Sequence, residues 1–452
     1  MENIKYPKVL IISHNALSLH FNNGKTLYSL FKDFPNYNVA QLFFQDEIPE
    51  SDKFSTYFKL TDVDVIKNVF KLKDRDICGN EQKIKLGEHF NYEMSKYKKI
   101  IINILRNNLF LLVLLRNLIY KLPYWNSKNL NIWIKNFSPD AIFFLGGNYK
   151  FSFNIANKLA KKYNIPLYIY ITDDYIFNKK KHAFFTNFQQ KMLIKTYKKA
   201  FNYAKYVFVI GDQMAKDFSN FFNKKFIPIM NLIEIEKYDS IKCDSIKCDS
   251  INNTDIITIV FIGGLHLNRW KQIVNLSNIL NKIIEETSIN VNVEIYSITP
   301  PEDDILQQLN KKPLFYKGKL FGDEVIRKMK SADLLLHVES DEEKYRQLTR
   351  LSVSTKISEY CACKKCIIAY GPNEVASIRL IEDNNLGITI TDSFTEEENF
   401  NKLKNLLINK ELRDKIGLNA YNFALNNFEA KSTRKKFLEY LIQKNENNNS
   451  VM

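Results

Sequence analysis

Short apolar runs alternate with segments of helical periodicity along nearly the whole chain of 452 residues. In the first half, the apolar runs predict strands at 8–13, 39–44, 141–145, 167–172 and 206–210. The helical segments between them are 24–33, 153–163, 185–203 and 212–222. Strands that alternate with helices form parallel sheets with crossover helices, so the pattern predicts an α/β fold.

The same alternation restarts in the second half. Strands are predicted at 256–262, 291–297, 314–317, 333–339, 366–370 and 388–390. Helices are predicted at 270–285, 322–331, 355–363, 373–383, 395–408 and 411–426. We therefore expect two Rossmann-like, doubly wound domains that face a cleft, with ligands at the carboxyl ends of the strands.

A tandem repeat, DSIKC-DSIKC-DSI at 239–251, marks the boundary between the two halves. It has no periodic apolar face and predicts a linker. The expected order is a first domain at 1–235, a linker at 236–254, a second domain at 255–428, a helix at 429–443 that packs back on the first domain, and a disordered tail at 444–452.

The chain is basic, with 65 Lys and Arg against 50 Asp and Glu and a net charge of +15. Such a surface favours anionic partners, although scattered lysines are equally typical of a solvated surface. A nucleic-acid-binding protein would show a clustered basic patch interleaved with aromatic residues. The sequence has no such cluster, so nucleic acid is not expected as a partner.

Cellular location is predicted from the cysteines and the apolar segments. No signal peptide precedes the six cysteines, which indicates reduced thiols in a cytoplasmic protein. Cys361, Cys363 and Cys366 are interpreted as buried apolar residues rather than zinc ligands. The segment 98–121 is too polar to span a bilayer; it predicts either an amphipathic helix in peripheral contact with the anionic inner face of the membrane or a core helix.

The most informative segment is SVSTKISEYCACKKCIIAYG at 352–371. Ser354 and Thr355 precede a helix, and Lys356 lies in its first turn. A helix start offers unpaired N–H groups and a positive dipole end, which suit a phosphate. Glu359 lies one turn further on the same face and could accept the hydroxyls of a ribose. Simple N-capping with solvated charges is the alternative interpretation.

A second segment, TIVFIGGLHLNRWKQ at 258–272, ends a predicted strand at two glycines. Gly263 and Gly264 allow close approach of the backbone to a ligand. Arg269 and Lys271 then stand at the start of the next helix, and Arg suits bidentate phosphate contacts. A tight turn with surface cations is the alternative. Because both segments follow strands of one sheet, their cations can converge on one diphosphate.

These two segments resemble the donor domain of family-four-type bacterial glycosyltransferases with the GT-B fold. The stretches FIGGL…NRWK and STKISEYCACKKCIIAYGP carry the resemblance. It implies that Arg269, Lys271, Thr355 and Lys356 contact the donor diphosphate and that Glu359 binds the ribose. Gly318 to Phe321 resembles the segment whose backbone meets the base.

The sequence departs from that family at one carboxylate. The family often shows two glutamates eight positions apart, and Leu351 stands eight residues before Glu359. Glu339, at the end of a predicted strand and followed by a loop at 340–350, is the expected substitute. His337 on the same strand is interpreted as a core residue.

The N-terminal half supplies further candidate residues. Gly24 and Lys25 open a helix and could face the donor phosphates, or serve as a helix cap. Asp173 and Asp174 end a strand and could accept a proton from an acceptor hydroxyl, or cap the next helix. A metal there is not expected, because cations already neutralise the leaving group. Two histidines of the first loop, His14 and His20, are secondary candidates.

The resemblance implies a hexosyltransferase of the retaining type, acting in surface polysaccharide or glycoconjugate synthesis. Its partners would be a nucleotide sugar of UDP or GDP type, used as a co-substrate rather than a bound cofactor, and a glycan or lipid-linked acceptor. Two alternatives stay open at this point: a nucleotide-sugar epimerase of the same fold, and an inactive nucleotide-sugar-binding scaffold.

Overall fold

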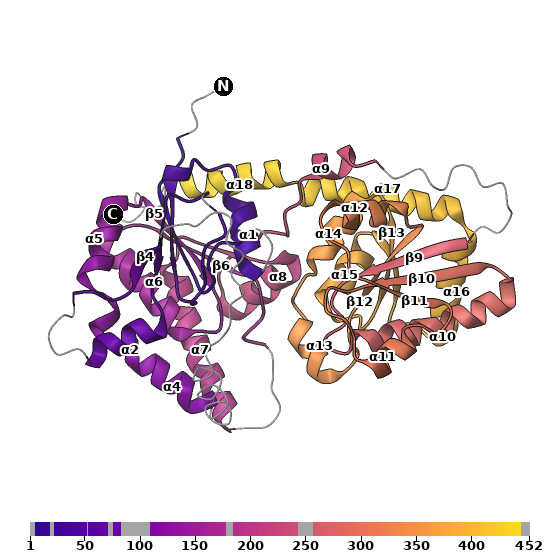
Figure 1. Cartoon of the computed structure of the whole chain (residues 1–452), viewed down its shortest axis with the longest axis horizontal. Helices are drawn as coiled ribbons and strands as arrows, with labels where there is room; N and C mark the ends of the chain where they lie inside the picture. The colour runs from indigo at the N-terminus through magenta and orange to yellow at the C-terminus, as the bar shows by residue number, and fades with distance from the viewer. Residues whose placement is uncertain are drawn as a thin grey trace.

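The computed structural model describes residues 5–18, 22–51, 53–70, 76–82, 109–177, 184–242 and 256–443. Two sheets, each covered by helices, lie at opposite ends of an elongated molecule (Figure 1). Cys243 and Cys248 of the repeat, His20, and residues 98–108 of the amphipathic segment lie outside the described residues.

The N-terminal sheet has the strand order β4-β3-β2-β1-β5-β6-β7-β8 within the described residues. All neighbouring strands are parallel except β3 and β4. The strands are β1 (Val9–Ser13), β2 (Val39–Phe43), β3 (Thr56–Lys59), β4 (Asn80–Gln82), β5 (Ala141–Gly146), β6 (Leu167–Ile171), β7 (Tyr206–Val209) and β8 (Ile227–Pro228). Every residue of β1, β2, β5 and β6 is buried, since helices cover both faces of this sheet.

The helices of this first unit are α1 (Asn22–Phe31), α2 (Asp62–Phe70), α4 (Leu109–Ile119), α5 (Lys128–Phe137), α6 (Lys150–Tyr163), α7 (Phe184–Tyr203) and α8 (Gly211–Phe222), with short 3-10 turns at Asn36–Asn38 and Pro123–Trp125. The five strands and four helices predicted here are all present. The sequence did not predict β3, β4 and β8, because strands of two to four residues carry too few apolar positions to show a period.

The C-terminal sheet is parallel throughout, in the order β11-β10-β9-β12-β13-β14. Its strands are β9 (Ile256–Ile262), β10 (Asn290–Tyr296), β11 (Leu314–Gly318), β12 (Leu334–Val338), β13 (Cys366–Tyr370) and β14 (Gly387–Ile390). Its helices are α10 (Arg269–Thr287), α11 (Asp303–Gln308), α12 (Asp323–Ser331), α13 (Glu343–Thr349), α14 (Thr355–Ala362), α15 (Ala376–Asp383), α16 (Glu396–Ile408) and α17 (Lys410–Asn427).

Two segments of this half differ from the sequence interpretation. Residues 340–350, expected to be a loop, contain the helix α13. The start of the expected linker forms helix α9 (Ile235–Ser240), in which Ile235 and Tyr238 are buried in the apolar core of the C-terminal sheet. A helix of six residues with apolar side chains at only two positions shows no helical period in the sequence.

The last helix, α18 (Ala430–Ile442), crosses from the C-terminal unit to the N-terminal one (Figure 1). Its Phe437 side chain lies in the N-terminal core, edge-on to Phe31 and Phe143. Its buried Arg434 forms ion pairs with Asp33 at 2.6 Å and Glu234 at 2.9 Å. The chain therefore closes on the unit in which it began.

Cysteine burial agrees with the sequence interpretation: Cys361, Cys363 and Cys366 are buried thiols within the C-terminal unit. Burial raises the pKa of Cys366 to about 12, so this thiol is protonated at neutral pH. Within the described ranges, each helix is too short or too polar to cross a membrane.

Candidate functional site at the domain junction

The candidate residues of the second unit gather where β9 and β12 end beside each other in the sheet. Tyr360 of α14 is buried, and its hydroxyl lies 3.2 Å from the carbonyl oxygen of Leu336 in β12 and 3.3 Å from the amide nitrogen of Ile262 in β9. Helix α14 is thereby fixed against the carboxyl ends of both strands. In a doubly wound sheet, this is the edge at which ligands bind.

Arg269 and Glu339 form a largely buried ion pair at this edge, with Nη2 and Oε2 3.0 Å apart. The other oxygen of Glu339 lies 3.2 Å from Nε2 of His337. Burial by itself raises the pKa of Glu339, but the adjacent His337 and the charge of Arg269 outweigh it and hold the pKa below its usual value. Glu339 is therefore ionised, and Arg269 is held at the start of α10.

Lys271 points to a different carboxylate. Its Nζ lies 2.7 Å from Oε1 of Glu342, which also accepts a hydrogen bond from Asn268 at 2.6 Å. The hydrogen bond between Lys271 and Glu342 raises the pKa of Lys271 and lowers that of Glu342. The sequence did not single out Glu342, because a single Glu in an expected loop carries no pattern.

The start of α14 has the geometry that the sequence predicts. The Ser354 hydroxyl caps the helix by accepting a hydrogen bond from the backbone N–H of Lys356. The side chain of Lys356 pairs with Glu359 one turn later, at 2.6 Å. Thr355 is exposed at the first helical position. Capping and a cation thus coexist at one helix N-terminus.

The segment before α14 lies on the N-terminal unit. Leu351 belongs to the N-terminal apolar core, and the Val353 carbonyl accepts a hydrogen bond from Asn231 at 3.2 Å. Arg350 pairs with Asp217 of α8 at 3.0 Å. Helix α14 therefore begins at the junction of the two units.

The N-terminal candidates meet at the carboxyl edge of their own sheet. A side chain at Gly24 would come within 2.5 Å of the carbonyl oxygen of Ala16, so α1 needs glycine here for close packing. Lys25 is exposed. The Thr172 hydroxyl lies 3.3 Å from both Asn23 and the carboxylate of Asp173, which joins the start of α1 to the end of β6.

Asp174 differs from its neighbour. Its side chain is buried, and Oδ1 accepts hydrogen bonds from the backbone N–H groups of Ile176 and Phe177. Burial raises its pKa despite these hydrogen bonds. Asp174 thus closes a local turn rather than capping the next helix, which begins at Phe184, whereas the half-buried Asp173 also accepts a hydrogen bond from the Tyr175 hydroxyl and lies closer to solvent.

The two glycines after β9 adopt ordinary backbone angles, but a side chain at Gly264 would overlap the ring of His266. His266 is a residue that sequence reasoning passed over; its ring lies 3.4 Å from Nη1 of Arg269. At the end of β11, Gly318 has φ +87° and Phe321 is 55% exposed. Within the described ranges, His, Cys, Asp and Glu residues do not cluster as a metal site.

Two Rossmann-like units and a C-terminal helix that crosses back to the first unit have the arrangement of the GT-B fold, and solved structures bear this out. Sucrose-phosphate synthase from Thermosynechococcus elongatus matches with a TM-score of 0.57 at 10% identity, over 95% of this chain and 96% of that one. WaaG, a glycosyltransferase of lipopolysaccharide biosynthesis, matches with 0.54 at 12%, over 96% and 100%. A Rickettsia africae glycosyltransferase matches with 0.57 at 14%, over 97% and 100%.

The chain thus has the GT-B fold, and its resemblance to GT-B glycosyltransferases is confirmed. An uncharacterized glycosyltransferase of Methanocaldococcus jannaschii is 28% identical over 247 residues, which cover 52% of this chain and 58% of the relative. The match therefore spans little more than half of either protein. No family model matches the chain.

His14, a secondary candidate, follows β1 and stacks on Tyr149 with ring centroids 4.3 Å apart. Burial, followed by the charge of Arg116, lowers its pKa to about 4. The folded protein therefore keeps His14 neutral at pH values at which an unfolded chain would protonate it.

This difference predicts a pH-dependent loss of stability. Below about pH 6.5 the His14 side chain binds a proton in the unfolded chain but not in the folded protein. The free energy of unfolding therefore falls as the pH drops from 6.5 toward 4. The gap between the two pKa values corresponds to about 3 kcal/mol. His14→Phe keeps the ring and should flatten the profile of unfolding free energy between pH 7 and 4.5. Parallel profiles for both proteins would contradict the assigned pKa.

Proposed function

We propose that this protein is a glycosyltransferase that moves a sugar from a nucleoside-diphosphate sugar to a hydroxyl group of an acceptor. The observation that carries the proposal is the placement of two cationic helix starts, with Arg269 and Lys356, at one sheet edge beside the domain junction. Two helix N-termini and two cations suit a diphosphate, which is the leaving group of such a transfer.

Donor binding would proceed by exchange of partners. Arg269 and Lys356 are paired with Glu339 and Glu359, so a bound diphosphate would compete with two carboxylates for these cations. Once released, Glu359 is free to accept hydrogen bonds from ribose hydroxyls. Lys271 is more exposed and would add charge at the rim. As the bond between sugar and diphosphate breaks, these cations would stabilise the growing negative charge.

The acceptor would lie against the N-terminal unit. Asp173 is the carboxylate at that edge best placed to orient or deprotonate an acceptor hydroxyl, whereas Asp174 is occupied by backbone N–H groups. Gly24 and Lys25 would face the donor across the cleft. In this proposal, residues 1–235 form the acceptor domain and residues 255–428 form the donor domain.

A UDP-type donor and a retaining reaction are part of the proposal, with GDP as the alternative base. A structural neighbour described as trehalose-6-phosphate from E. coli, bound with UDP-2-fluoro glucose, has the same fold at 11% identity and a TM-score of 0.56. The proposed acceptor is a glycan or a lipid-linked glycan of surface polysaccharide or glycoconjugate synthesis. The reacting group of this acceptor is a hydroxyl group.

Nucleotide binding gives the first test. We expect UDP or GDP, but not CMP, to raise the melting temperature, because a ligand at a hundredfold excess over its Kd adds about 2.7 kcal/mol to stability. Arg269→Ala and Lys356→Ala should each abolish the shift. Lys415→Ala, which removes an exposed cation on α17, is the matched control and should keep it.

The outcomes separate the alternatives. A shift retained in both site variants would place the nucleotide elsewhere and overturn the assignment. The absence of a shift with all four nucleotides UDP, GDP, ADP and CMP would overturn the proposal of a preformed donor site. A shift without any sugar release from UDP-glucose or GDP-mannose would favour the inactive scaffold.

The two neighbouring aspartates give a second test. Asp173→Asn should lower kcat for sugar release from the donor to water by about 10²–10⁴-fold, as expected for loss of a general base, and leave the nucleotide-induced shift unchanged. Asp174→Asn retains an oxygen for the turn and should leave kcat close to the wild-type value, because this side chain is already bonded to backbone N–H groups. Equal losses of kcat at equal stability would contradict the assignment.

Peripheral membrane contact through 98–121 also belongs to the proposal, with one revision. Arg116 is not a free surface cation: it pairs with Asp62 at 2.9 Å and lies over the ring of Phe151. Among the described side chains of α4, residues 114–119, Leu115 and Leu118 are 52% and 58% exposed. Two exposed leucines next to a basic segment suit the interface of an anionic bilayer at the inner face of the cytoplasmic membrane.

Replacing Leu115 and Leu118 together by Ser should reduce co-sedimentation with phosphatidylglycerol vesicles by about tenfold or more, since each leucine contributes about 1.5–3 kcal/mol when buried. Leu418→Ser, at an equally exposed leucine of α17, is the control. Equal binding by the wild type and the double variant would refute the contact.

A further inference from the structure

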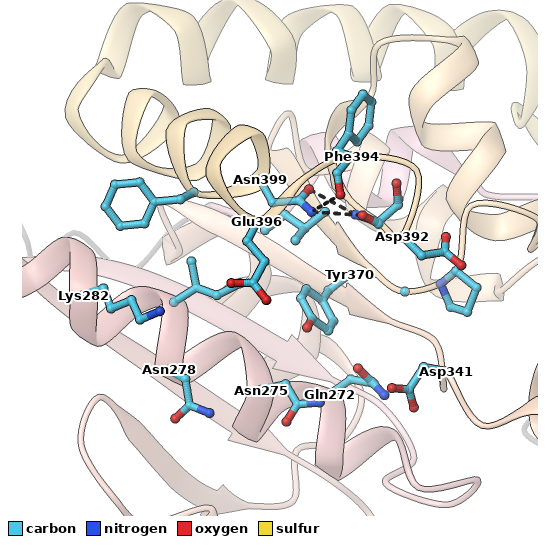
Figure 2. A pocket seen from close by; sticks show the side chains of 16 residues that line it. Gln272, Asn275, Asn278, Lys282, Asp341, Tyr370, Asp392, Phe394, Glu396 and Asn399 are labelled. Carbon is cyan, nitrogen blue, oxygen red and sulfur yellow. Dashed lines mark hydrogen bonds between the residues drawn. The ribbon is translucent and has the colours of Figure 1, made fainter.

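A pocket of about 440 Å³ lies on the C-terminal unit, between α10, α16 and the ends of β13 and β14 (Figure 2). Its size is within the range of roughly 300–1,000 Å³ that is typical of small-molecule sites. All its lining residues come from the second unit, so it does not depend on the domain junction. The side chains that the argument uses are Gln272, Asn275, Lys282, Asp341, Tyr370 and Glu396.

The pocket lining carries a net negative charge, whereas each cation of the proposed donor site is paired with a carboxylate. Asp341 and Glu396 line it without an ion pair among the described residues, and Lys282 is the cation on its α10 side. Both carboxylates raise the pKa of Tyr370, whose burial is the larger cause. A phosphate-bearing ligand would meet a net negative lining here, so the pocket does not suit a nucleotide.

One buried hydrogen-bond donor in this pocket lacks a partner. Gln272 is 2% exposed, and its Nε2 has no hydrogen-bond partner within the described part of the chain. An unsatisfied buried amide is unfavourable, and a ligand with an acceptor oxygen would satisfy it. In Figure 2, Gln272 lies beside Asn275 at the floor of the view, with Tyr370 between them and α16.

The pocket wall opposite α10 is already fixed. Asn399 of α16 donates from Nδ2 to the carbonyl of Thr391 at 2.9 Å and accepts from the Thr391 N–H at 3.2 Å (Figure 2). Asp392 accepts from the backbone N–H of Asn373 at 2.9 Å and lies 3.4 Å from Arg346. These bonds hold the loop after β14 in place, so the pocket is formed before any ligand enters.

From these observations we propose that this pocket binds an uncharged carbohydrate, at a site separate from the nucleotide site. A sugar hydroxyl both donates and accepts, which matches carboxylates that only accept and amides that do both. The free Nε2 of Gln272 needs an acceptor, which a hydroxyl supplies and an ammonium ion does not. Tyr370 adds an aromatic surface for the apolar face of a sugar ring. The proposal does not rest on transferase activity.

The test uses the full-length protein and saturation-transfer NMR with glucose, galactose, mannose, N-acetylglucosamine, maltose, cellobiose and lactose, without nucleotide. We expect at least one of them to bind. Gln272→Leu and Asn275→Ala should each weaken this binding about tenfold, and Arg269→Ala in the donor site should leave it unchanged. Addition of UDP should not displace the sugar.

Stability provides an independent readout for Gln272→Leu. Replacing an unpaired buried amide by an apolar group of similar size is expected to leave the melting temperature equal or higher. A lowered melting temperature would mean that the amide is satisfied and would overturn the argument. Binding that is lost in Arg269→Ala but kept in Gln272→Leu would place the sugar in the cleft, and failure of all seven sugars would also overturn the proposal.

Discussion

The candidate site depends on the contact between the segment from Arg350 to Ser354 and the N-terminal unit. Leu351 is buried in the N-terminal core, and three residues later Ser354 caps a helix of the C-terminal unit. The ion pair between Arg350 and Asp217 lies at the same place. A helix N-terminus is thereby held at the junction, where its dipole and N–H groups can meet a ligand shared by both units.

A second constraint sets the direction in which that helix faces. The buried Tyr360 hydroxyl lies within hydrogen-bonding distance of backbone groups of two adjacent strands, so α14 cannot slide without leaving these groups unpaired. Arg269 follows one of those strands, and Glu339 ends the other. The positions of Arg269 and Lys356 thus depend on the parallel pairing between β9 and β12 and on the hydroxyl group of Tyr360.

Long elements could be predicted from the sequence because a buried parallel strand is a continuous apolar run and a covering helix repeats every 3.6 residues. The start of α14, with Ser354 and Lys356, could also be predicted from the sequence. The partners were not: that Arg269 faces Glu339 while Lys271 faces Glu342 depends on side-chain geometry across 70 residues of chain. Likewise, the sequence of the pair Asp173-Asp174 does not indicate which of the two side chains accepts hydrogen bonds from the backbone of a turn.

The pocket on α10 could not be foreseen for the same reason, since its lining comes from α10, α16 and the loops after β12, β13 and β14. Its position has a physical consequence. Gln272 and Lys271 are neighbours on α10, yet one lies at an acidic pocket and the other belongs to the cationic edge. One helix can therefore separate two ligands of unlike charge, because an anion is repelled from the first site and a neutral sugar gains little from the second.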